Sequence, residues 1–408
     1  MRKAAAPRAT GLRRFCEMLS LQEAQARLLA LCEPVELEQR AVAECAGHFL
    51  TEPLIAGRTQ PMVALSIMDG FAVAGPVQTR FRIVGEASAG HPFDRSLTPG
   101  EAVRISTGAH IPGGAASVWP QEIADDAGDT VTLTGERPEP LDCFIRHVGS
   151  DFTAGDRLLP AGQRIGPGTI ALALTAGHPT LPVRRRVHLA VLETGDELAS
   201  GSAVADDYLT PACNGAMVAA MMRSLPCAVQ APPITPDHPG ALRETLETCS
   251  RADVIVTIGG ASIGRHDLIA QALTDWGAKL AFWRVALKPG KPLLVARRGR
   301  QLVLGLPGNP ASTFVTAFLF LLPAVRSLLG ATDPFPQPLR LPLGFSCPAG
   351  GSRHELLRAR LENGRLVLTG GQQSGLLHSL ALAEYLIERR AGALPLAPGE
   401  LVRCFALN

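Results

Sequence analysis

Apolar residues recur at helical spacing near the start of the chain, and this pattern predicts an amphipathic helix over residues 19–32. The residues that make this apolar face are Leu21, Ala24, Leu28 and Leu31. Ser20 precedes the face and Glu23 follows three residues later, as in a capping box that satisfies two backbone N–H groups. Pro34 ends the pattern, and a second helix is expected over residues 42–50.

The pattern changes to short alternating runs between residues 53 and 146, and glycine, proline and aspartate turns separate these runs. Alternation of apolar and polar residues is typical of half-buried strands, so this region is predicted to be a small all-β domain. The runs cover residues 81–84, 102–105 and 130–133. Residues 152–182 are rich in glycine and carry one apolar segment, 169–176, which is expected to be a connector helix that packs on the N-terminal helices.

Between residues 186 and 330, apolar runs of strand length are each followed by a turn that contains glycine. These runs cover residues 187–192, 254–258 and 301–306, and helical stretches follow at 268–276 and 311–329. Such repetition predicts a parallel sheet covered by helices on both faces, with ligands at the carboxyl ends of its strands. After a proline-rich linker near residue 334, short strands are expected again to the C-terminus.

The overall charge excludes some classes of partner. Among 408 residues, 39 lysines and arginines face 37 acidic residues, and aromatic residues make up only 5%. A nucleic-acid coat or a polybasic membrane anchor needs a stronger positive bias, so any anion site must be local. We therefore expect no nucleic-acid partner.

The cysteines and the chain ends favour a cytoplasmic protein. The 9 cysteines are dispersed without metal-ligand spacing, as expected for free thiols in a reducing compartment. The basic segment at residues 1–14 lacks the apolar stretch of a secretion signal. The most apolar run, residues 314–325, is shorter than the roughly 20 residues that span a bilayer, so no membrane span is expected.

Two loops after predicted strands have the chemistry of anion sites. In the first, Gly259 and Gly260 allow backbone N–H groups to face an anion, Ser262 adds a hydroxyl, and Asp267 could hold a metal ion or a hydroxyl group. The second loop, residues 305–312, has prolines that stiffen a glycine turn at a helix start. The first loop could also be a tight strand-to-helix turn, because the Walker lysine and the Rossmann glycine spacing are both absent from it. The prolines of the second loop could simply end its strand.

Charged residues supply the rest of a possible site. Lys288 and Lys291 flank a stiff Pro-Gly turn and could clamp a phosphate or another oxyanion. Asp69, in the sequence Met-Asp-Gly-Phe, lies beside a glycine, Glu197 follows the predicted strand 187–192, and Asp237 lies in a proline-rich loop. Carboxylates of this kind suit Mg²⁺, which prefers carboxylate and phosphate oxygens, although any one of them could be a surface or turn residue.

Six motifs follow one another along the chain. They are Ser-Ile-Met-Asp-Gly at 66–70, Thr-Gly-Ala at 107–109 with Glu122, Thr-Gly-Asp-Glu-Leu at 194–198, Gly-Gly-Ala-Ser-Ile-Gly at 259–264 with Asp267, Lys-Pro-Gly-Lys-Pro at 288–292 and Pro-Gly-Asn-Pro at 307–310. In this order they resemble the molybdopterin molybdenumtransferase family, which includes bacterial MoeA and the E domain of gephyrin. The resemblance extends from about Leu19 to the C-terminus.

The resemblance implies an elongated multidomain chain of α/β plus β class. Its parts would be a helical connector (15–52 and 147–183), a β-rich domain (53–146), a three-layer α/β domain of molybdopterin-binding type (184–330) and a C-terminal β domain (339–408). It also implies a homodimer whose site joins the α/β domain of one subunit to the Asp69 domain of the other. The implied reaction inserts molybdate into adenylylated molybdopterin, with Mg²⁺, and releases AMP.

The resemblance also assigns site residues by motif position. The catalytic residues would be Asp69, Thr107, Glu197, Asp237 and Asp267, and the metal ligands would be Glu197, Asp237 and Asp267. Asp151 would be a further functional acid. Residues that bind substrate would be Gly259, Gly260, Ser262, Gly264, Lys288, Lys291, Pro307, Gly308, Asn309, Ser312, Arg358 and Ser374. Lys288, Lys291, Ser312, Arg358 and Ser374 would lie near molybdate and the pterin phosphate.

Some positions depart from the family pattern and leave alternatives open. Ile67 replaces an alanine, Arg265 and His266 replace acidic or small residues, and Ala-Glu-Tyr-Leu at 383–386 replaces Ala-Asn-Gly-Leu. These changes could alter the metal site or weaken turnover. The alternatives are a divergent paralogue that binds or delivers the pterin without catalysis, and an enzyme of the preceding adenylyltransferase step.

Overall fold

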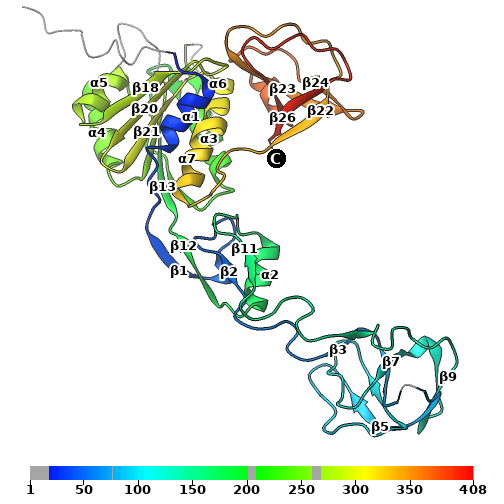
Figure 1. The fold of residues 1–408 in the computed structure, drawn as a ribbon. Coiled ribbons are helices and arrows are strands. Elements are labelled where there is room, and N and C mark those ends of the chain that lie inside the picture. Colours follow the sequence, from blue (N-terminus) through cyan, green and yellow to red (C-terminus); the bar gives the residue numbers. More distant parts are fainter. Residues whose placement is uncertain (1–17, 76, 201–207, 260–267, 408) are drawn as a thin grey trace, which may run out of the picture.

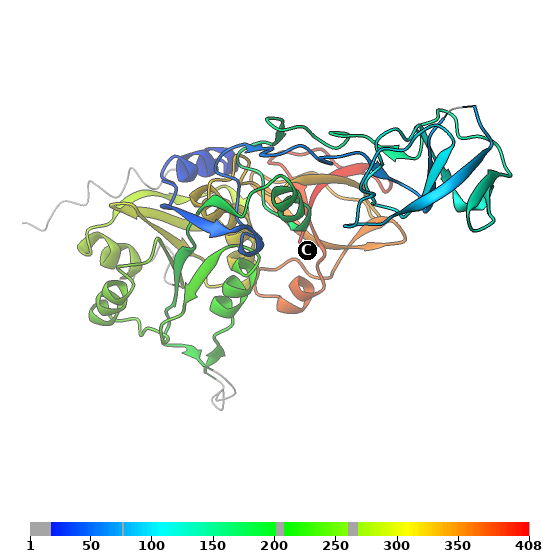
Figure 2. The same ribbon diagram turned by 90° about the horizontal axis from the view of Figure 1, so that it is seen from below.

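The chain forms an elongated molecule built from several small bodies (Figure 1). The computed structural model describes residues 18–75, 77–200, 208–259 and 268–407. A helix-covered sheet and the C-terminal strands lie at one end, a β-rich body lies at the other, and a small body connects them (Figures 1 and 2). This is the predicted α/β plus β class.

The N-terminal helix α1 (Leu21–Leu29) forms where the apolar spacing predicts it. Its capping box is present, because the Ser20 hydroxyl accepts the Glu23 N–H at 3.2 Å and the Glu23 carboxylate accepts the Ser20 N–H at 3.1 Å. The apolar face of α1 packs on helix α7 (Leu322–Leu328) of the large sheet domain. α1 therefore contributes to the core of the sheet domain.

The connecting body has its own small core, formed by residues such as Val42, Leu54 and Ile165. Helix α2 occurs as predicted, but it packs against this core and not on α1. The second helix predicted over residues 42–50 is wrong, since only a single turn of 3₁₀ helix forms there. The elements are β1 (Leu37–Ala41), η2 (Val42–Glu44), β2 (Leu54–Ile55), β11 (Arg157–Leu159), α2 (Pro167–Thr175) and β12 (Thr180–Arg184).

The β-rich body contains a six-stranded sheet in the order β7-β4-β6-β5-β9-β8. Alternate residues of β4 face two different apolar clusters, with Phe71 in one and Ala72 in the other, so this strand is buried on both faces and apolar throughout. The elements are β3 (Leu65–Ser66), β4 (Gly70–Val73), β5 (Arg80–Ala87), β6 (Glu101–Ile105), β7 (Ser117–Pro120), η3 (Gln121–Ile123), β8 (Ala124–Asp126), β9 (Thr130–Leu133) and β10 (Ile145–Arg146).

The large sheet domain has three layers, and the strand order of its sheet is β16-β13-β17-β21-β20-β18. One face packs against α1, α3, α6 and α7, and the other packs against α4 and α5. Its elements are β13 (Val187–Glu193), β14 (Leu198–Ala199), β15 (Thr210–Pro211), α3 (Asn214–Met222), β16 (Cys227–Gln230), α4 (Pro239–Thr248), β17 (Val254–Ile258), α5 (Leu268–Asp275), β18 (Lys279–Arg284), β20 (Pro292–Arg298), β21 (Gln301–Leu306), α6 (Pro310–Thr316), a π-helical turn (Ala317–Leu321) and α7.

The sheet is mixed, which corrects the prediction of a parallel sheet. The strands β16, β13, β17 and β21 are parallel, whereas β20 and β18 run antiparallel to their neighbours. Only Gly299 and Arg300 separate β20 from β21, and so short a connection permits only an antiparallel pair.

The C-terminal strands form a second sheet in the order β19-β23-β25-β26-β22, with β24 paired to β23. Its first strand, β19, comes from the chain of the large sheet domain. Phe405 near the C-terminus contacts Phe318 of the large domain, with ring centroids 6.0 Å apart. The elements are β19 (Leu287–Lys288), β22 (Pro338–Pro342), β23 (His354–Glu362), β24 (Arg365–Leu368), α8 (Leu377–Ala381), β25 (Tyr385–Arg389) and β26 (Leu401–Ala406).

One helical run is long and apolar enough to cross a membrane. α6, the π-helical turn and α7 continue over Pro310–Leu328, a length of 19 residues. The argument that this region is too short was therefore wrong. However, 83% of its apolar stretch is buried inside the protein, as in the core helix of a globular domain.

Candidate functional site

The structure brings Asp69 and Thr107 together in the β-rich body. Asp69 is exposed in the bend between β3 and β4. Its Oδ1 accepts the backbone N–H of Thr107 at 2.6 Å, and its carbonyl accepts the Gln121 N–H at 3.1 Å. Two residues that the sequence places 38 positions apart thus share one direct contact.

The glycine after Asp69 is required by a close approach of the backbone. A Cβ at Gly70 would lie 1.9 Å from the carbonyl oxygen of Trp119 on the paired strand β7. Ile67, the bulky departure from the family pattern, is 46% exposed and donates its N–H to the Phe144 carbonyl at 2.9 Å. Its side chain thus lies largely at the surface, next to the exposed Asp69.

Carboxylates gather at the carboxyl end of β13. The Thr194 hydroxyl donates to Asp237 Oδ1 at 2.7 Å, and the Asp237 N–H donates to Asp196 Oδ1 at 3.0 Å. Glu197 is the exposed residue that follows Asp196 in this turn. The turn therefore brings the predicted residues Glu197 and Asp237 to one edge of the sheet, where Asp196 holds the backbone of Asp237.

Two predicted glycine loops meet at this same edge. Gly259 has φ +101°, and a Cβ there would lie 2.3 Å from the carbonyl oxygen of Thr194. A Cβ added at Gly308 would lie 3.7 Å from the Cα of Gly259, so the two loops are in close contact. Gly260, Ser262, Gly264 and Asp267, together with the departures Arg265 and His266, lie outside the described residues.

The second loop leads into α6 and is held by contacts from both sides. The Asn214 side-chain amide donates to the Gly308 carbonyl at 2.7 Å, and the Ala311 N–H donates to the Ser374 carbonyl at 3.0 Å. Pro307 and Ser312 are buried, whereas Gly308 and Asn309 are exposed. Ser374, a predicted substrate residue of the C-terminal region, therefore lies directly at the start of α6.

The two predicted lysines lie where the large domain meets the C-terminal sheet. Lys288 is on β19, and its Nζ donates to Glu355 Oε1 at 2.9 Å. Lys291 is exposed after the turn. Between them Gly290 packs on α6, since a Cβ there would lie 2.7 Å from Thr316 Cγ2. The lysine turn thus adjoins the helix that carries Ser312.

Arg358 occupies a different position from the other predicted substrate residues. It is 1% exposed, and its Nη2 donates to the carbonyls of Gly371 and Gln373 at 2.9 and 3.0 Å. Burial lowers the pKa of this guanidinium. These contacts favour a role in holding the loop that carries Ser374 over direct contact with a ligand.

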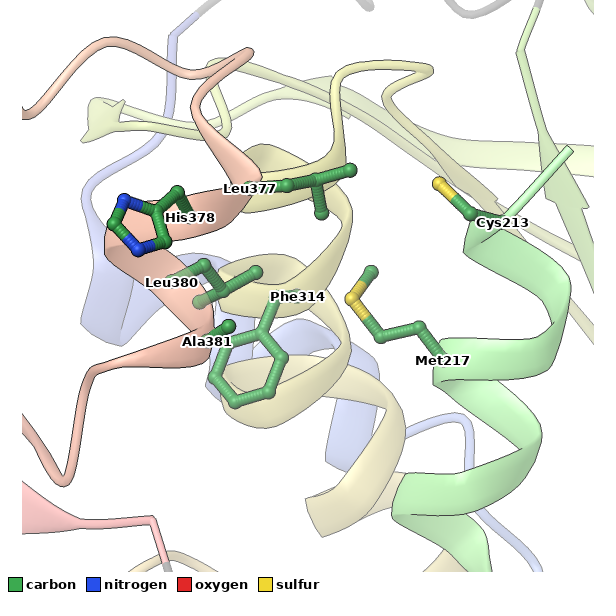
Figure 3. A pocket seen from close by; sticks show the side chains of 7 residues that line it. All are labelled: Cys213, Met217, Phe314, Leu377, His378, Leu380 and Ala381. Atoms are coloured by element: carbon green, nitrogen blue, oxygen red, sulfur yellow. The ribbon is translucent and has the colours of Figure 1, made fainter. Parts of the chain in front are cut away.

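An apolar pocket of about 490 Å³ opens beside this loop between α3, α6 and α8 (Figure 3). Its walls include Met217 and Phe314 of the large domain and Leu377 and His378 of the C-terminal region. Its volume is in the range of small-molecule sites, roughly 300–1,000 Å³. The pocket therefore extends the candidate site across the junction of the two sheets.

The predicted residues thus fall into two groups. The carboxylate edge, the glycine loops, α6 and the lysine turn lie together at the large domain. Asp69 and Thr107 belong to the β-rich body at the far end of the chain (Figure 1), and Asp151 is exposed in the connector, where its N–H donates to the Gln60 carbonyl at 3.1 Å.

Potential metal ligands are of the carboxylate type. Among the residues with described positions, no three His, Cys, Asp or Glu side chains converge on one point. Of the predicted ligands, Glu197 and Asp237 come from adjacent turns, and Asp267 is not among those residues. Oxygen donors of this type fit Mg²⁺.

Two residues that position this site were not predicted: Asn214 holds the Gly308 carbonyl, and Glu355 pairs with Lys288. Asp196 was expected among the acids of this sheet edge, but not as the residue that holds the Asp237 backbone. The only sequence signal for Glu355 was that it lies inside a stretch noted for the resemblance. Asn214 lies outside all such stretches.

The chain has a central three-layer domain with glycine loops and carboxylates at its strand ends, and a β region on each side of it. This arrangement defines a multidomain protein of the MoeA class. Family models match in the same order: the MoeA N-terminal region (domain I and II) at residues 19–177, a probable molybdopterin binding domain at 190–327, and the MoeA C-terminal region (domain IV) at 340–407.

Curated relatives cover most of the chain. A molybdopterin molybdenumtransferase of Haemophilus influenzae is 31% identical over 318 residues, which are 77% of this chain and 78% of the relative. One from Staphylococcus aureus is 29% identical over 375 residues, 89% of each chain. The chain belongs to the molybdopterin molybdenumtransferase family.

A solved structure agrees with the fold. The molybdopterin biosynthesis MoeA protein of Pyrococcus horikoshii superposes with a TM-score of 0.81 and 22% sequence identity, and the match covers 96% of this chain and all of that one. The whole arrangement of bodies, and not only the central domain, therefore has a counterpart of known structure.

Proposed function

We propose that the protein is an enzyme of molybdenum cofactor biosynthesis in the cytoplasm, which inserts molybdate into adenylylated molybdopterin and releases AMP. The observation that carries this proposal is the match to all three family regions in order, together with transferases that cover 77–89% of the chain. The geometry of the site supports the same chemistry.

The anionic groups of the substrates would bind at the junction of the two sheets. Lys288 and Lys291 flank one turn there, and Gly290 between them packs on Thr316 at the end of α6. Cationic side chains favour phosphate and molybdate oxygens. Ser312 and Ser374 would add polar contacts on the same side.

Glu197 and Asp237, with Asp267, would hold Mg²⁺ at the carboxylate edge. The ion would supply neutralisation of the phosphoanhydride charge. In the reaction, an oxygen of water or molybdate attacks the phosphorus on the molybdopterin side of the phosphoanhydride, the bond from that phosphorus to the bridging oxygen breaks, and AMP departs with the electron pair. The lysines stabilise the negative charge that develops on these oxygens. The two sulfurs of the pterin dithiol then bond to molybdenum, and one molybdate oxygen leaves with the two thiol protons as water.

We further propose a homodimer in which Asp69 and Thr107 of one subunit complete the site of the other. Within one chain these two residues belong to a body far from the carboxylate edge (Figure 1). The contact between Asp69 Oδ1 and the Thr107 N–H holds the carboxylate in a fixed orientation at the surface, as required for a residue that a partner subunit presents.

The two alternatives have less support. A single-domain adenylyltransferase would not need the β-rich and C-terminal regions, which match the MoeA models. A binder without catalysis would not need the exposed acids, which are retained at Asp69, Glu197 and Asp237.

Release of AMP tests the proposal. The protein is incubated with adenylylated molybdopterin, Mg²⁺ and molybdate, and AMP is quantified. We expect molybdate-dependent AMP, and a loss of about 100-fold or more in Asp69→Ala, as is typical when a positioned acid is removed. Asp125→Ala, which removes an exposed acid of the same body, should retain the wild-type rate. Tight pterin binding without any AMP would establish the non-catalytic alternative.

A further inference from the structure

Lys288 already has an anionic partner in the folded chain. Its Nζ lies 2.9 Å from Glu355 Oε1. The lysine side chain is 53% exposed, whereas the glutamate side chain is only 18% exposed. A predicted anion-binding cation is therefore paired with a largely buried carboxylate.

The pairing is fixed by the backbone. Strand β19 runs parallel to β23, with Leu287 opposite His354 and Lys288 opposite Glu355. The His354 N–H donates to the Ala286 carbonyl at 2.8 Å, which locks this register. Glu355 thus faces Lys288 because of sheet pairing between the two domains, and not through a chance side-chain conformation.

The same strand also supports the opposite side of the anion site. Three residues after Glu355, Arg358 holds the carbonyls of Gly371 and Gln373. These residues directly precede Ser374, whose carbonyl accepts the Ala311 N–H at the start of α6. β23 therefore positions the lysine turn and the Ser374 loop together.

A carboxylate at this place has two opposing effects on a bound anion. A half-exposed lysine has a flexible stem with several rotatable bonds, and an ion pair restricts it to one direction. The ammonium group has three donors, so two stay available for an anion. However, the negative charge of Glu355 repels the same anion and weakens its binding.

We propose that Glu355 is the positioning residue of the anion site, which both orients Lys288 and limits how tightly that lysine holds a molybdate-type oxyanion. Orientation favours binding of the anion in the reactive position, and repulsion favours its release. The proposal rests on the proposed function, because molybdate is the anion of that reaction.

Two substitutions separate the effects of orientation and charge. Glu355→Gln keeps an oxygen acceptor for Lys288 but removes the negative charge. Glu355→Ala removes both. If Glu355 were purely structural, both variants would bind the anion more weakly. If it positions Lys288 as proposed, Glu355→Gln binds the anion more tightly and Glu355→Ala binds it more weakly.

The test measures initial rates of AMP release against molybdate concentration. In Glu355→Gln we expect the KM for molybdate and kcat to fall together by about two- to five-fold, the range for partly exposed charges. In Glu355→Ala the KM should rise. In a Lys288→Ala background only the effect of charge remains, so both Glu355→Gln and Glu355→Ala should lower the KM. Glu362→Gln, which alters an exposed ion pair with Arg360 on the same strand, is the matched control and should match wild type.

A second readout does not depend on turnover. Isothermal titration calorimetry measures the binding of molybdate and tungstate to the full chain without pterin. Tighter binding to Glu355→Gln than to wild type supports the proposal even if wild type releases no AMP, which would refute only the proposed function. Equal binding to the two proteins, binding unaltered by Lys288→Ala, or no binding to wild type overturns the proposal.

Discussion

At the scale of single residues, the candidate site is shaped by side chains that bond to backbone carbonyls. Asn214 is 7% exposed, and its amide donates to the Gly308 carbonyl at 2.7 Å. Arg358 holds two carbonyls in the loop that carries Ser374. Loops of this kind keep a fixed shape only if their polar backbone groups have partners.

Replacement of Asn214 by Ala should therefore loosen the loop at Gly308. Loss of this part-buried hydrogen bond costs about 0.5–1.5 kcal/mol of stability. We also expect the KM for adenylylated molybdopterin to rise about five- to ten-fold with a smaller change in kcat, because an ordered loop contributes mainly to binding. Steady-state kinetics and thermal denaturation measure the two effects.

The matched control for this change is Gln271→Ala. It truncates an amide of the same kind on the exposed side of α5, where the amide donates to Asp275. An equal rise in KM in both variants would show that Asn214 has no special relation to the loop.

Contacts within one motif could be predicted from the sequence, whereas contacts between distant segments could not. Thr194 and Glu197 are placed at one sheet edge because they follow the same strand, and the structure shows this arrangement. The burial of Arg358 depends on a loop 13–15 residues away in the sequence, and the bond from Asn214 spans 94 residues. Contacts between residues so far apart in the sequence produce no repeating pattern of apolar and polar residues from which they could be predicted.

At the scale of elements, hydrophobic spacing predicted the central strands and helices, and the errors occurred where tertiary contacts override local preference. Residues 42–50 have helical spacing, yet the Gly47 and Leu50 N–H groups donate to the carbonyls of Ile165 and Gln163, each at 2.9 Å. These bonds fix an extended path beside another segment. Gly47, with φ +84°, provides the left-handed conformation that interrupts a helix there.

Within the β-rich body, one acidic side chain ties β6 to its neighbours and predicts a dependence on pH. Glu101 is 7% exposed and pairs with Arg82 and Arg95 at 3.0 and 2.8 Å. The Arg95 guanidinium, followed by the Thr98 N–H, lowers the pKa of Glu101 from 4.5 to about 2. A lowered folded-state pKa stabilises the body above about pH 4.5, and this stabilisation is lost as the pH falls towards 2.

Glu101→Gln should therefore lower the melting temperature of this body at pH 7, by about 2–4 °C. The difference from wild type should shrink steadily below about pH 4.5, since the wild-type carboxylate is then protonated as well. Differential scanning calorimetry at several pH values measures this. Glu136→Gln, at an exposed position of the same body, is the control. A difference that stays constant down to pH 3 would contradict the ion-pair explanation.

At the scale of the whole molecule, the elongated shape separates chemical groups that the proposed reaction needs in one place. The carboxylate edge and the lysine turn lie at the large sheet domain, and Asp69 lies in the β-rich body at the other end (Figures 1 and 2). A dimer can restore the missing half of the site when each subunit presents its β-rich body to the other.

Complementation between inactive variants tests this arrangement. Asp69→Ala and Glu197→Ala should each be inactive as homodimers. After the two are unfolded together in equal amounts and refolded, half of the dimers should be mixed, and each mixed dimer has one intact site. The rate of AMP release should then recover to about one quarter of wild type.

The same experiment contains its own control. A sample made from Asp69→Ala and the double variant Asp69→Ala/Glu197→Ala also forms mixed dimers, but none of them contains an intact site. Activity in that sample would show that the reaction does not need Asp69. No activity in the first sample, despite mixed dimers seen by mass spectrometry, would show that each chain uses only its own residues.

Strand β19 determines whether the C-terminal region can be removed from the chain by truncation. Two of its residues complete the C-terminal sheet, and Phe405 returns to pack on Phe318 in the large domain. Removal of everything after the proline-rich linker would therefore also remove contacts that the large domain itself makes with the C-terminal sheet. A chain shortened there would carry an uncovered apolar surface and an unpaired strand edge beside its anion site, and such edges promote aggregation. The C-terminal region is thus a structural part of the large domain that cannot be removed independently.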